Sequence, residues 1–456
     1  MGDLSSLVTR EEVLKALRGV PGREDVHLLD DYTVERASSG VEGFTSIILR
    51  VKVSYRLPGY DQAKSHVFFV KTMPQFEYQR ELMKTSRVFS KEWLVFSEVA
   101  PLMAKVSAGR VTIPLPACYH GICTDDTAIF YMEDLVDSGY RAAGRSYLSD
   151  GLDYAHCSLV MKGLGKLHAL SLAAEKTLDP GKGGWAGAFP EFNREFIYYI
   201  PGPGDPPVAI QNMVDSMIQN FKELCREVDG LPKEAEASGA LERVLEGVWP
   251  TLCRLKETPP NNRNVLVHGD CWMNNMMFRY EKGEEGEAKE PVAVKFFDLQ
   301  RSKCCHPSID LLYFMYLSTR RPFREKYFST LIDEYHSSLT ENLEVLGAGF
   351  PPFSLVDFKE ELMGEYKPFG LIICMFYSPI MLLGDEFLLP NADDMTADRM
   401  EEFFTTGSTP QIRLRFHSDP KFRSIVEDIV REFVDMALPN GLESVDSSPL
   451  LRQKVN

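Results

Sequence analysis

The segment that most constrains this chain is residues 265–300, in which short apolar runs alternate with acidic turns. An apolar run at 265–267 leads into His-Gly-Asp at 268–270, and Asn275 follows the aspartate by five positions. His-x-Asp followed by Asn at this distance is the spacing of the catalytic loop of kinases. The pattern predicts a strand that ends at a loop whose polar side chains face a cleft.

A second acidic turn follows in the same segment. After an apolar run at 276–280 and a strongly charged stretch, another apolar run at 292–297 ends at Asp298. An acidic residue at the end of this strand corresponds to the aspartate of the Asp-Phe-Gly turn of kinases. The sequence therefore predicts two carboxylates, from two separate turns, in one site.

Phosphoryl transfer accounts for this set of side chains. The protein takes little part in the covalent chemistry of this reaction. It has to hold the acceptor hydroxyl in line with the bond that breaks, and to supply charges that neutralise the phosphates. We interpret Asp270 as the catalytic base, which accepts or orients the hydroxyl proton. Asn275 and Asp298 offer the hard oxygen ligands that Mg²⁺ prefers. His268 is more typical of a structural histidine that hydrogen-bonds the loop than of a base.

Each of these residues also has a simpler interpretation. Asp270 can form a turn, Asn275 can cap a helix, and Asp298 can simply end a strand. Any one of them alone favours the simpler interpretation. Their joint spacing, with apolar runs in the right places, favours the functional one.

A lysine in an otherwise apolar run adds to the site. Lys71 lies within residues 67–72 (VFFVKT), and a lysine is costly to bury without a partner. In kinases a lysine on such a strand contacts the α- and β-phosphates and pairs with a glutamate on the next helix. We expect Glu92 as that partner, with Glu98 and Glu81 as alternatives. The simpler interpretation is a lysine that extends to solvent from a strand end.

Two further sets of residues are candidates for nucleotide binding, and both depend on the fold. The first precedes a strand expected at 46–55 and could present backbone N–H groups to phosphate, although a plain β-turn fits nearly as well. The second follows a strand expected at 128–132, where a kinase hinge binds adenine through backbone groups. The first set is Gly40, Gly43 and Ser46, and the second is Glu133 and Leu135.

The hydrophobic pattern changes near residue 135. Before it, residues 46–55 alternate between apolar and polar, which is typical of a half-buried strand. Thr9 and Glu12 have the spacing of a capping box that opens a short helix. After it, residues 154–172 and 213–228 have the spacing of long helices.

The sequence thus predicts an α+β protein with a two-lobed, protein-kinase-like fold. Residues 1–135 form a small β-rich N-terminal lobe with the phosphate loop, the lysine strand and the hinge. Residues 136–440 form a large, mostly helical C-terminal lobe with the catalytic loop and an acceptor pocket, which residues 369–383 could line. Residues 441–456 form a flexible tail.

Composition limits the partners. Of the 456 residues, 50 are basic and 66 acidic, and the net charge of −16 disfavours nucleic acid and anionic lipid. The nine cysteines include no Cys-x-x-Cys pair, which is typical of reduced thiols in the cytosol. The first residues lack the apolar core of a signal peptide, and the apolar run at 369–383 is too short for a membrane span. We expect a cytoplasmic protein with no nucleic acid, membrane or obligate protein partner.

The motifs resemble the ecdysteroid kinase-like family, also called CHK kinase-like, whose relatives are the choline kinases and aminoglycoside phosphotransferases. The stretches that carry the resemblance are GVEGFTSIILRVKVSY, FFVKTMP, FSKEWLVFSEVAP, YMEDLVDSGY, LGKLHALSL, VHGDCWMNNMMF and VKFFDLQRSKCCHPSIDLLYFMYLS. The resemblance implies ATP between two lobes, Lys71 on the phosphates and Asp270 as base. It also implies Asn275 and Asp298 on magnesium, and Asp310 as a structural brace of the catalytic loop.

The predicted function is an ATP- and Mg²⁺-dependent kinase that phosphorylates a hydroxyl of a small-molecule alcohol. The family's name suggests a steroid alcohol such as an ecdysteroid. One alternative is a kinase-like nucleotide-binding scaffold without turnover. Another is a metal-dependent phosphate-ester hydrolase, which should hold two metals and often several histidines; His268 and His306 lie near the motif.

Overall fold

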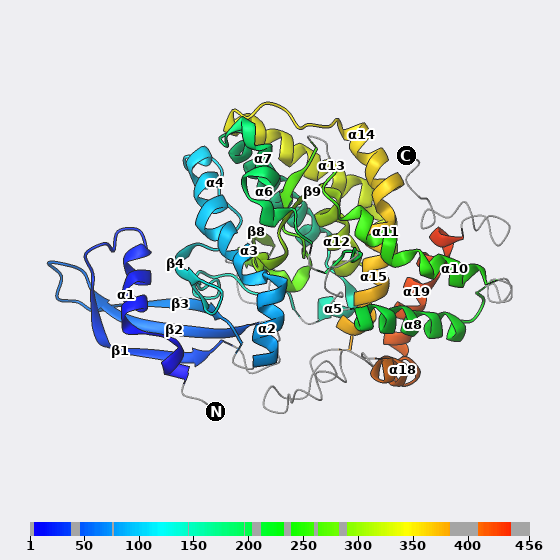
Figure 1. The fold of residues 1–456 in the computed structure, drawn as a ribbon, viewed down its shortest axis with the longest axis horizontal. Coiled ribbons are helices and arrows are strands. Elements are labelled where there is room, and N and C mark those ends of the chain that lie inside the picture. Colours follow the sequence, from blue (N-terminus) through cyan, green and yellow to red (C-terminus); the bar gives the residue numbers. More distant parts are fainter. Residues whose placement is uncertain are drawn as a thin grey trace.

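The computed structural model describes residues 4–37, 46–74, 77–144, 146–195, 197–202, 211–231, 239–259, 263–281, 290–383 and 409–438. A β-sheet formed by the N-terminal residues lies at one end of the molecule, and a larger helical part lies at the other (Figure 1). This arrangement confirms the predicted α+β class. Gly40, Gly43 and the predicted tail at 441–456 lie outside the described residues, and the lobe boundaries stay a prediction.

The N-terminal sheet is antiparallel, with the strand order β1-β2-β3-β5-β4. Leu49, Val51 and Val53 of β2 are fully buried, as the alternation at 46–55 predicts. Their intervening neighbours lie on the other face of the sheet. The strands are β1 (His27–Arg36), β2 (Ile47–Arg56), β3 (Lys64–Thr72), β4 (Cys118–Cys123) and β5 (Ala128–Glu133).

Helix α1 (Arg10–Gly19) packs on this sheet and shares a separate hydrophobic core with it. The predicted capping box is present, since Thr9 accepts from the Glu12 amide and Glu12 reaches back to Thr9. Gly19 permits the close packing on β4, because a Cβ there would lie 2.1 Å from the Tyr119 carbonyl oxygen.

A helical segment connects the sheet to the helical part and lies between the two in Figure 1. It consists of α2 (Glu77–Ser86), α3 (Val88–Leu94), the π-helical turn η2 (Val95–Val99) and α4 (Ala100–Ser107). Residues 88–107 thus form one helical segment that contains a wider turn. Trp93 stacks on Phe130 of β5 with 5.5 Å between the ring centroids, which ties this segment to the sheet.

The helical part is built around α6 (Tyr154–Glu175), which packs along α13 (Arg321–Leu346). Most of α6 is buried, and Gly165 allows close approach because a Cβ there would lie 2.7 Å from the Tyr335 carbonyl oxygen. The other helices are α5 (Ser146–Asp150), α7 (Gly184–Ala188), α8 (Gln211–Glu227), α10 (Ala240–Glu246), α11 (Val248–Leu255), α12 (Ser308–Ser318), α14 (Leu355–Glu361), α15 (Lys367–Met381), α18 (Thr409–Ser418) and α19 (Pro420–Ala437). Short helical turns are η1 (Leu4–Leu7), η3 (Pro180–Lys182), η4 (Pro190–Phe192) and η7 (Leu362–Tyr366).

The apolar run at 369–383 falls largely on α15, most of whose residues are buried. It packs against α12 and α19. Met375 and Phe376 are core residues with 2% and 3% exposure, so they pack the interior rather than line an open pocket. No helix in the described part of the chain is long and apolar enough to cross a membrane.

Two small antiparallel sheets carry the acidic turns. Strand β6 (Val265–Val267) pairs with β9 (Lys303–Cys305), and β7 (Met276–Tyr280) pairs with β8 (Pro291–Phe296). The catalytic-loop motif therefore connects one sheet to the other. Two 3-10 turns complete the set, η5 (Met273–Asn275) before β7 and η6 (Leu299–Arg301) after β8.

Candidate active site

The His-Gly-Asp loop leaves β6 and is held by a buried carboxylate. Asp310, at the start of α12, accepts hydrogen bonds from the backbone amides of His268 (2.7 Å) and Gly269 (2.9 Å). Asp310 is fully buried, and although burial opposes its charge, the hydrogen bond from His168 lowers the pKa of its carboxyl below the ordinary value. Its position supports the structural role that the family resemblance implies.

Sequence reasoning missed the residues behind Asp310. Nε2 of His168, on α6, lies 3.1 Å from Asp310, and the Tyr335 hydroxyl of α13 lies 2.9 Å from Nδ1 of the same ring. A histidine inside the apolar stretch LGKLHALSL was the available signal, because a fully buried imidazole needs polar partners. The network anchors the catalytic loop to the two longest helices.

The contacts of His268 fit the structural role that the sequence favours. Its Nε2 donates to the Phe297 carbonyl at 2.8 Å, and its Nδ1 accepts from the Asp270 amide at 3.3 Å. Both ring nitrogens are thereby used within the loop and the strand end. The ring cross-links the two acidic turns rather than facing a substrate.

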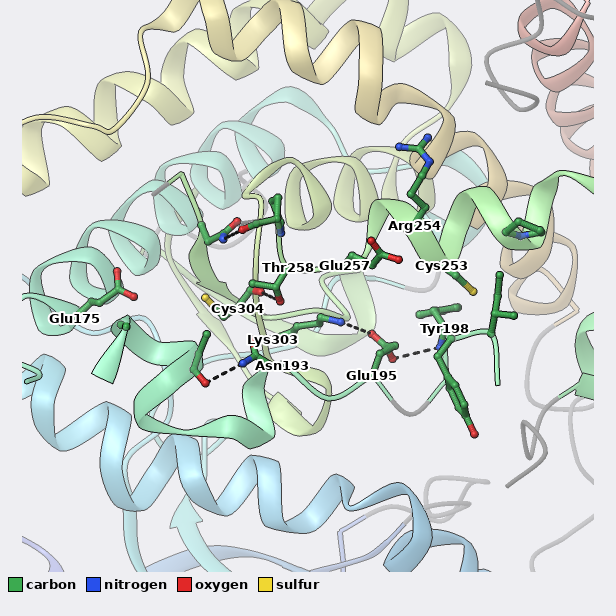
Figure 2. A pocket seen from close by; sticks show the side chains of 18 residues that line it. Glu175, Asn193, Glu195, Tyr198, Cys253, Arg254, Glu257, Thr258, Lys303 and Cys304 are labelled. Atoms are coloured by element: carbon green, nitrogen blue, oxygen red, sulfur yellow. Dashed lines mark hydrogen bonds and ion pairs between the residues drawn. The ribbon is translucent and has the colours of Figure 1, made fainter. Parts of the chain in front are cut away.

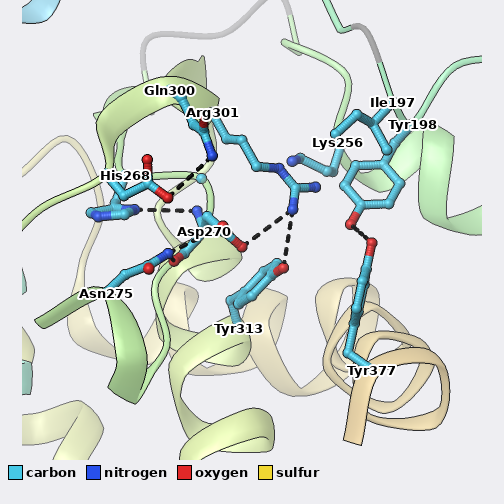
Figure 3. Close-up of polar contacts among 12 residues, drawn as sticks. Ile197, Tyr198, Lys256, His268, Asp270, Asn275, Gln300, Arg301, Tyr313 and Tyr377 are labelled. Carbon is cyan, nitrogen blue, oxygen red and sulfur yellow. Dashed lines mark hydrogen bonds and ion pairs between the residues drawn. The ribbon is translucent and has the colours of Figure 1, made fainter. Parts of the chain in front are cut away.

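Asp270 and Asn275 lie together, as their spacing predicts. The side-chain amide nitrogen of Asn275 donates to the Asp270 carbonyl oxygen at 2.9 Å and to its carboxylate Oδ2 at 3.1 Å (Figure 3). This orientation leaves the amide oxygen of Asn275 for a cation. The donor set of one amide oxygen and the Asp298 carboxylate fits Mg²⁺, which prefers hard oxygen ligands.

Lys71, Glu92 and Asp298 form one ion-pair cluster that joins the sheet to the helical part, with Lys71 and Glu92 buried and Asp298 partly exposed. The Lys71 ammonium lies 2.6 Å from Glu92 Oε2 and 2.5 Å from Asp298 Oδ1. Glu92 was the first choice of partner, and the structure places it there. Its second oxygen accepts from the Leu299 amide at 3.3 Å, directly after Asp298.

Electrostatics keep this lysine charged. Burial alone would lower the pKa of Lys71, but the carboxylates of Asp298 and Glu92 outweigh burial and raise it above the ordinary value. For Glu92, burial raises the pKa of the carboxyl while the lysine opposes that change. The charged Lys71 ammonium therefore lies next to the Asp298 carboxylate, which could also bind a metal ion.

Asp298 has an unusual backbone conformation. Its φ is 64°, in the left-handed region that residues other than glycine rarely adopt. Gln300 Nε2 donates to its carboxylate at 3.1 Å, and the carboxylate is 26% exposed. Strained backbone of this kind is concentrated at functional sites, where the surrounding structure holds it in place.

Arg301 is a site residue that sequence reasoning did not single out. Its Nη1 lies 3.2 Å from Asp270 Oδ1 and 3.3 Å from the Tyr313 hydroxyl (Figure 3). Its guanidinium also lies over the Tyr198 ring, 4.8 Å from the centroid, and the Tyr198 hydroxyl is 2.6 Å from that of Tyr377. The sequence signal was a cation three positions after Asp298 in a buried turn.

The predicted nucleotide-binding residues are only partly described. Ser46 is buried directly before β2. The amide of Glu133 donates to the Ala117 carbonyl and its carboxylate pairs with Lys295 at 2.5 Å, so its amide and side chain already have partners. The Leu135 carbonyl accepts from the Tyr140 amide. Their part in adenine binding stays a prediction.

An ion pair that the sequence analysis did not foresee supports this hinge segment. Arg50 of β2 makes a two-point contact with Asp134, with N–O distances of 2.7 and 2.9 Å. Asp134 also accepts from the amides of Val136 and Asp137. A buried carboxylate thus holds the turn after β5 in a fixed shape against the sheet.

A cavity of about 1210 Å³ lies beside this site, between α7, α11 and β9 (Figure 2). Glu195 and Lys303 line it. The ammonium groups of Lys256 and Lys303 are 3.5 and 3.7 Å from Glu195 Oε2. Burial opposes the charge of Glu195, but the surrounding lysines outweigh it and lower its pKa far below the ordinary value. Tyr198 connects this cavity to Arg301.

The family model described as "Ecdysteroid kinase-like family" matches residues 40–348, more than half of the chain. The chain belongs to this family. The matched span contains every predicted site residue, from Gly40 to Asp310. The protein is thus a kinase-like phosphotransferase of the ecdysteroid kinase-like family, and the family implies a nucleotide and a small molecule as substrates.

Two other comparisons complete this result. No curated protein matches the chain. Among solved structures, the chain is similar to one from Haemophilus somnus 129PT that is described as a fructosamine-3-kinase. The identity is 13%, the match covers 88% of this chain and 97% of the other, and the TM-score is 0.31.

Proposed function

We propose that this ecdysteroid kinase-like protein transfers the γ-phosphoryl group of ATP to a hydroxyl of a small molecule and requires Mg²⁺. The observation that carries the proposal is the Lys71–Glu92–Asp298 cluster, in which a lysine of the sheet lies 2.5 Å from the acidic turn of the helical part. Asp270 and Asn275 supply the remaining groups of a phosphoryl-transfer site on one loop.

Each residue has a defined task in this mechanism. Asp270 accepts the proton of the acceptor hydroxyl, and its hydrogen bonds from Asn275 and Arg301 fix the direction of its carboxylate. Lys71 binds the α- and β-phosphates while Glu92 holds its ammonium in place. Mg²⁺, held by Asn275 and Asp298, would neutralise charge on the phosphates.

The proposed binding arrangement follows the predicted lobes. ATP lies between residues 1–135 and residues 136–440, with Gly40, Gly43 and Ser46 at the phosphates and the Glu133–Leu135 segment at adenine. The acceptor lies on the side of Asp270 that carries the phenol groups of Tyr198, Tyr313 and Tyr377. A steroid alcohol such as an ecdysteroid is the first class to test, because the family's name points to it. The nine free cysteines support a cytoplasmic location.

Titration calorimetry tests the site without knowledge of the acceptor. ATP is titrated into the full-length protein with Mg²⁺ and with EDTA, for the wild type, for Asp298→Asn and for a control, Asp428→Asn, on the exposed face of α19. We expect Mg²⁺-dependent binding that Asp298→Asn loses and the control keeps. ATP binding that is the same with EDTA, or an absence of binding by folded wild type, would contradict the proposal and favour the scaffold or hydrolase alternatives.

A further inference from the structure

The catalytic loop of this protein contains no cation of its own. Residues 268–275 read His-Gly-Asp-Cys-Trp-Met-Asn-Asn, without lysine or arginine. Phosphoryl transfer spreads negative charge over the oxygens of the transferring group, and catalysis depends on neutralising that charge. Lys71 is engaged at Glu92 and Asp298. A cation beside Asp270 would add to the charge that Mg²⁺ and Lys71 supply.

Arg301 is the cation that the fold brings to this position. It ends the η6 turn that begins directly after Asp298, so one short turn carries both the proposed metal ligand and the arginine. Nη1 lies 3.2 Å from Asp270 Oδ1. Gly269 makes this approach possible, because a Cβ on it would lie 2.0 Å from the Arg301 carbonyl oxygen.

The guanidinium has hydrogen-bonding capacity to spare. Nη1 serves Asp270 and Tyr313, and the guanidinium also interacts with the hydroxyls of Tyr198 and Tyr377. Nη2 is buried and makes no hydrogen bond of normal geometry among the described residues. A buried N–H group without a partner costs free energy. A ligand oxygen next to Asp270 would satisfy it, and phosphoryl oxygens suit a planar guanidinium well.

The surroundings hold this side chain charged and in place. The rings of Tyr198 and Tyr313 lie 4.8 and 5.9 Å from its guanidinium carbon (Figure 3). Burial opposes the charge of Arg301, but the facing phenols and the Asp270 carboxylate outweigh it and raise the pKa well above the ordinary value. A rigid, desolvated cation of this kind is what stabilises developing charge without reorganisation.

We propose that Arg301 is a catalytic residue that binds a non-bridging oxygen of the transferring phosphoryl group. The inference rests on the proposed function. The oxygen of the acceptor hydroxyl forms a bond to the γ-phosphorus while the bond to the β,γ-bridging oxygen breaks. The hydroxyl proton passes to Asp270, the electron pair leaves with ADP, and Arg301 is chemically unchanged.

A planar phosphoryl mimic tests this role without an acceptor. The release rate of a fluorescent ADP is measured with Mg²⁺, with and without aluminium fluoride, for the wild type, Arg301→Gln and Arg301→Lys. The matched control is Arg321→Gln at the start of α13, a partly exposed arginine that pairs with Glu325 and Asp435. We expect fluoride to slow release from the wild type and from the control. In Arg301→Gln we expect about 10²-fold less slowing with unchanged Mg-ADP affinity, and partial recovery in Arg301→Lys.

The possible outcomes distinguish failure of the Arg301 inference from failure of the proposed function. Unchanged Mg-ADP affinity shows that Arg301→Gln is folded, so a loss confined to the fluoride complex assigns the contact. Asp270→Asn, with Arg301 intact, should keep most of the slowing by fluoride. If Arg301 acted only by orienting Asp270, this variant would lose the slowing as well. Full slowing in Arg301→Gln, or no slowing in a wild type that binds Mg-ADP, would overturn the inference. A wild type that does not bind Mg-ADP would instead contradict the proposed function.

Discussion

At the scale of single residues, the two carboxylates of the site have different surroundings, which fits the different tasks that we propose for them. Asp270 is hydrogen-bonded by Asn275 and Arg301, whereas Asp298 contacts Lys71 and Gln300. A carboxylate fixed by a neutral amide and a cation is oriented for a single incoming hydroxyl. The Asp298 carboxylate, next to Lys71, lies where it could bind a metal ion that also contacts the phosphates.

The different tasks predict a separation of binding from turnover. Asp270→Asn keeps the shape of the side chain but removes the proton acceptor, so we expect phosphoryl transfer to fall by about 10²–10⁴-fold. ATP affinity in the same calorimetric assay should stay near that of the wild type. Transfer by the variant at an undiminished rate would remove Asp270 as the base, and equal losses of binding and transfer would indicate a structural role instead.

Sequence reasoning found the residues that a motif defines and missed those that only packing brings in. Asp270, Asn275 and Asp298 are separated along the chain by fixed distances, and that spacing is itself the signal. His168 lies on a long apolar helix and Arg301 in a short turn. Each offers only a weak sequence signal, a single polar residue in an apolar stretch or after a motif, without a fixed spacing. Their partners come from α12, α13 and the catalytic loop.

At the scale of elements, the strands were predicted where side chains alternate cleanly. Strands β2, β3 and β5 were expected, but β1 and β4 were not. In β1 the register shifts between Leu28 and Tyr32, which breaks the period of two. In β4 every residue is partly exposed, so no buried face appears in the sequence CYHGIC. Alternation of apolar and polar residues predicts a strand only when one face is buried and the other exposed. A strand whose two faces are similarly exposed shows no such pattern.

The catalytic turn itself depends on one glycine. Gly269 has a φ of 81°, and a Cβ there would lie 2.0 Å from the Arg301 carbonyl oxygen. We expect Gly269→Ala to destabilise the protein by more than the roughly 1–2 kcal/mol that the left-handed conformation costs an alanine, since the clash adds to it. Gly22→Ala is the matched control, because its φ is 77° and nothing lies within 4 Å of the added atom.

The measurement is the free energy of unfolding from denaturant titration, together with transfer activity. Gly22→Ala should show the conformational cost alone and keep its activity, while Gly269→Ala should lose stability and transfer. Equal destabilisation by the two substitutions would show that the loop shifts to accommodate the methyl group. The close contact with the Arg301 carbonyl would then not explain the glycine at position 269.

At the scale of the whole molecule, the site is assembled from both ends of the fold. Lys71 comes from the sheet and Asp298 from the helical part, and their contact joins segments separated by 227 positions. Behind them, buried polar networks fix the helices that carry the loops. One such network surrounds His306, whose ring stacks on Tyr366 with centroids 4.3 Å apart and whose Nε2 lies 3.1 Å from Glu361.

This histidine makes stability depend on pH. Burial lowers the pKa of His306 to about 3, whereas an unfolded histidine titrates near 6.5. Between these values the unfolded chain binds a proton that the folded protein does not, so stability falls as the pH decreases from 6.5 towards 3. One proton corresponds to about 1.4 kcal/mol per pH unit. The folded protein is therefore more stable at neutral pH than at acidic pH because of this group.

We expect His306→Gln, which keeps a hydrogen-bond donor towards Glu361 but does not titrate, to lose less stability than the wild type between pH 7 and 5. The difference should be about 2 kcal/mol for one proton over this range, measured by denaturant titration at each pH. Parallel pH profiles for the two proteins would show that His306 accepts a proton in the folded state as readily as in the unfolded one.

The sequence by itself determined the class of the fold and the central chemistry, because periodicity and fixed motif spacing are local properties that can be read along the chain. The α+β order, the loop from His268 to Asn275, and the lysine with its glutamate partner all follow from such patterns. Only the tertiary structure decided which residues surround Asp270. Arg301, Tyr198 and Tyr377 come from separate segments, and their approach depends on how buried helices and turns pack, which no local pattern encodes.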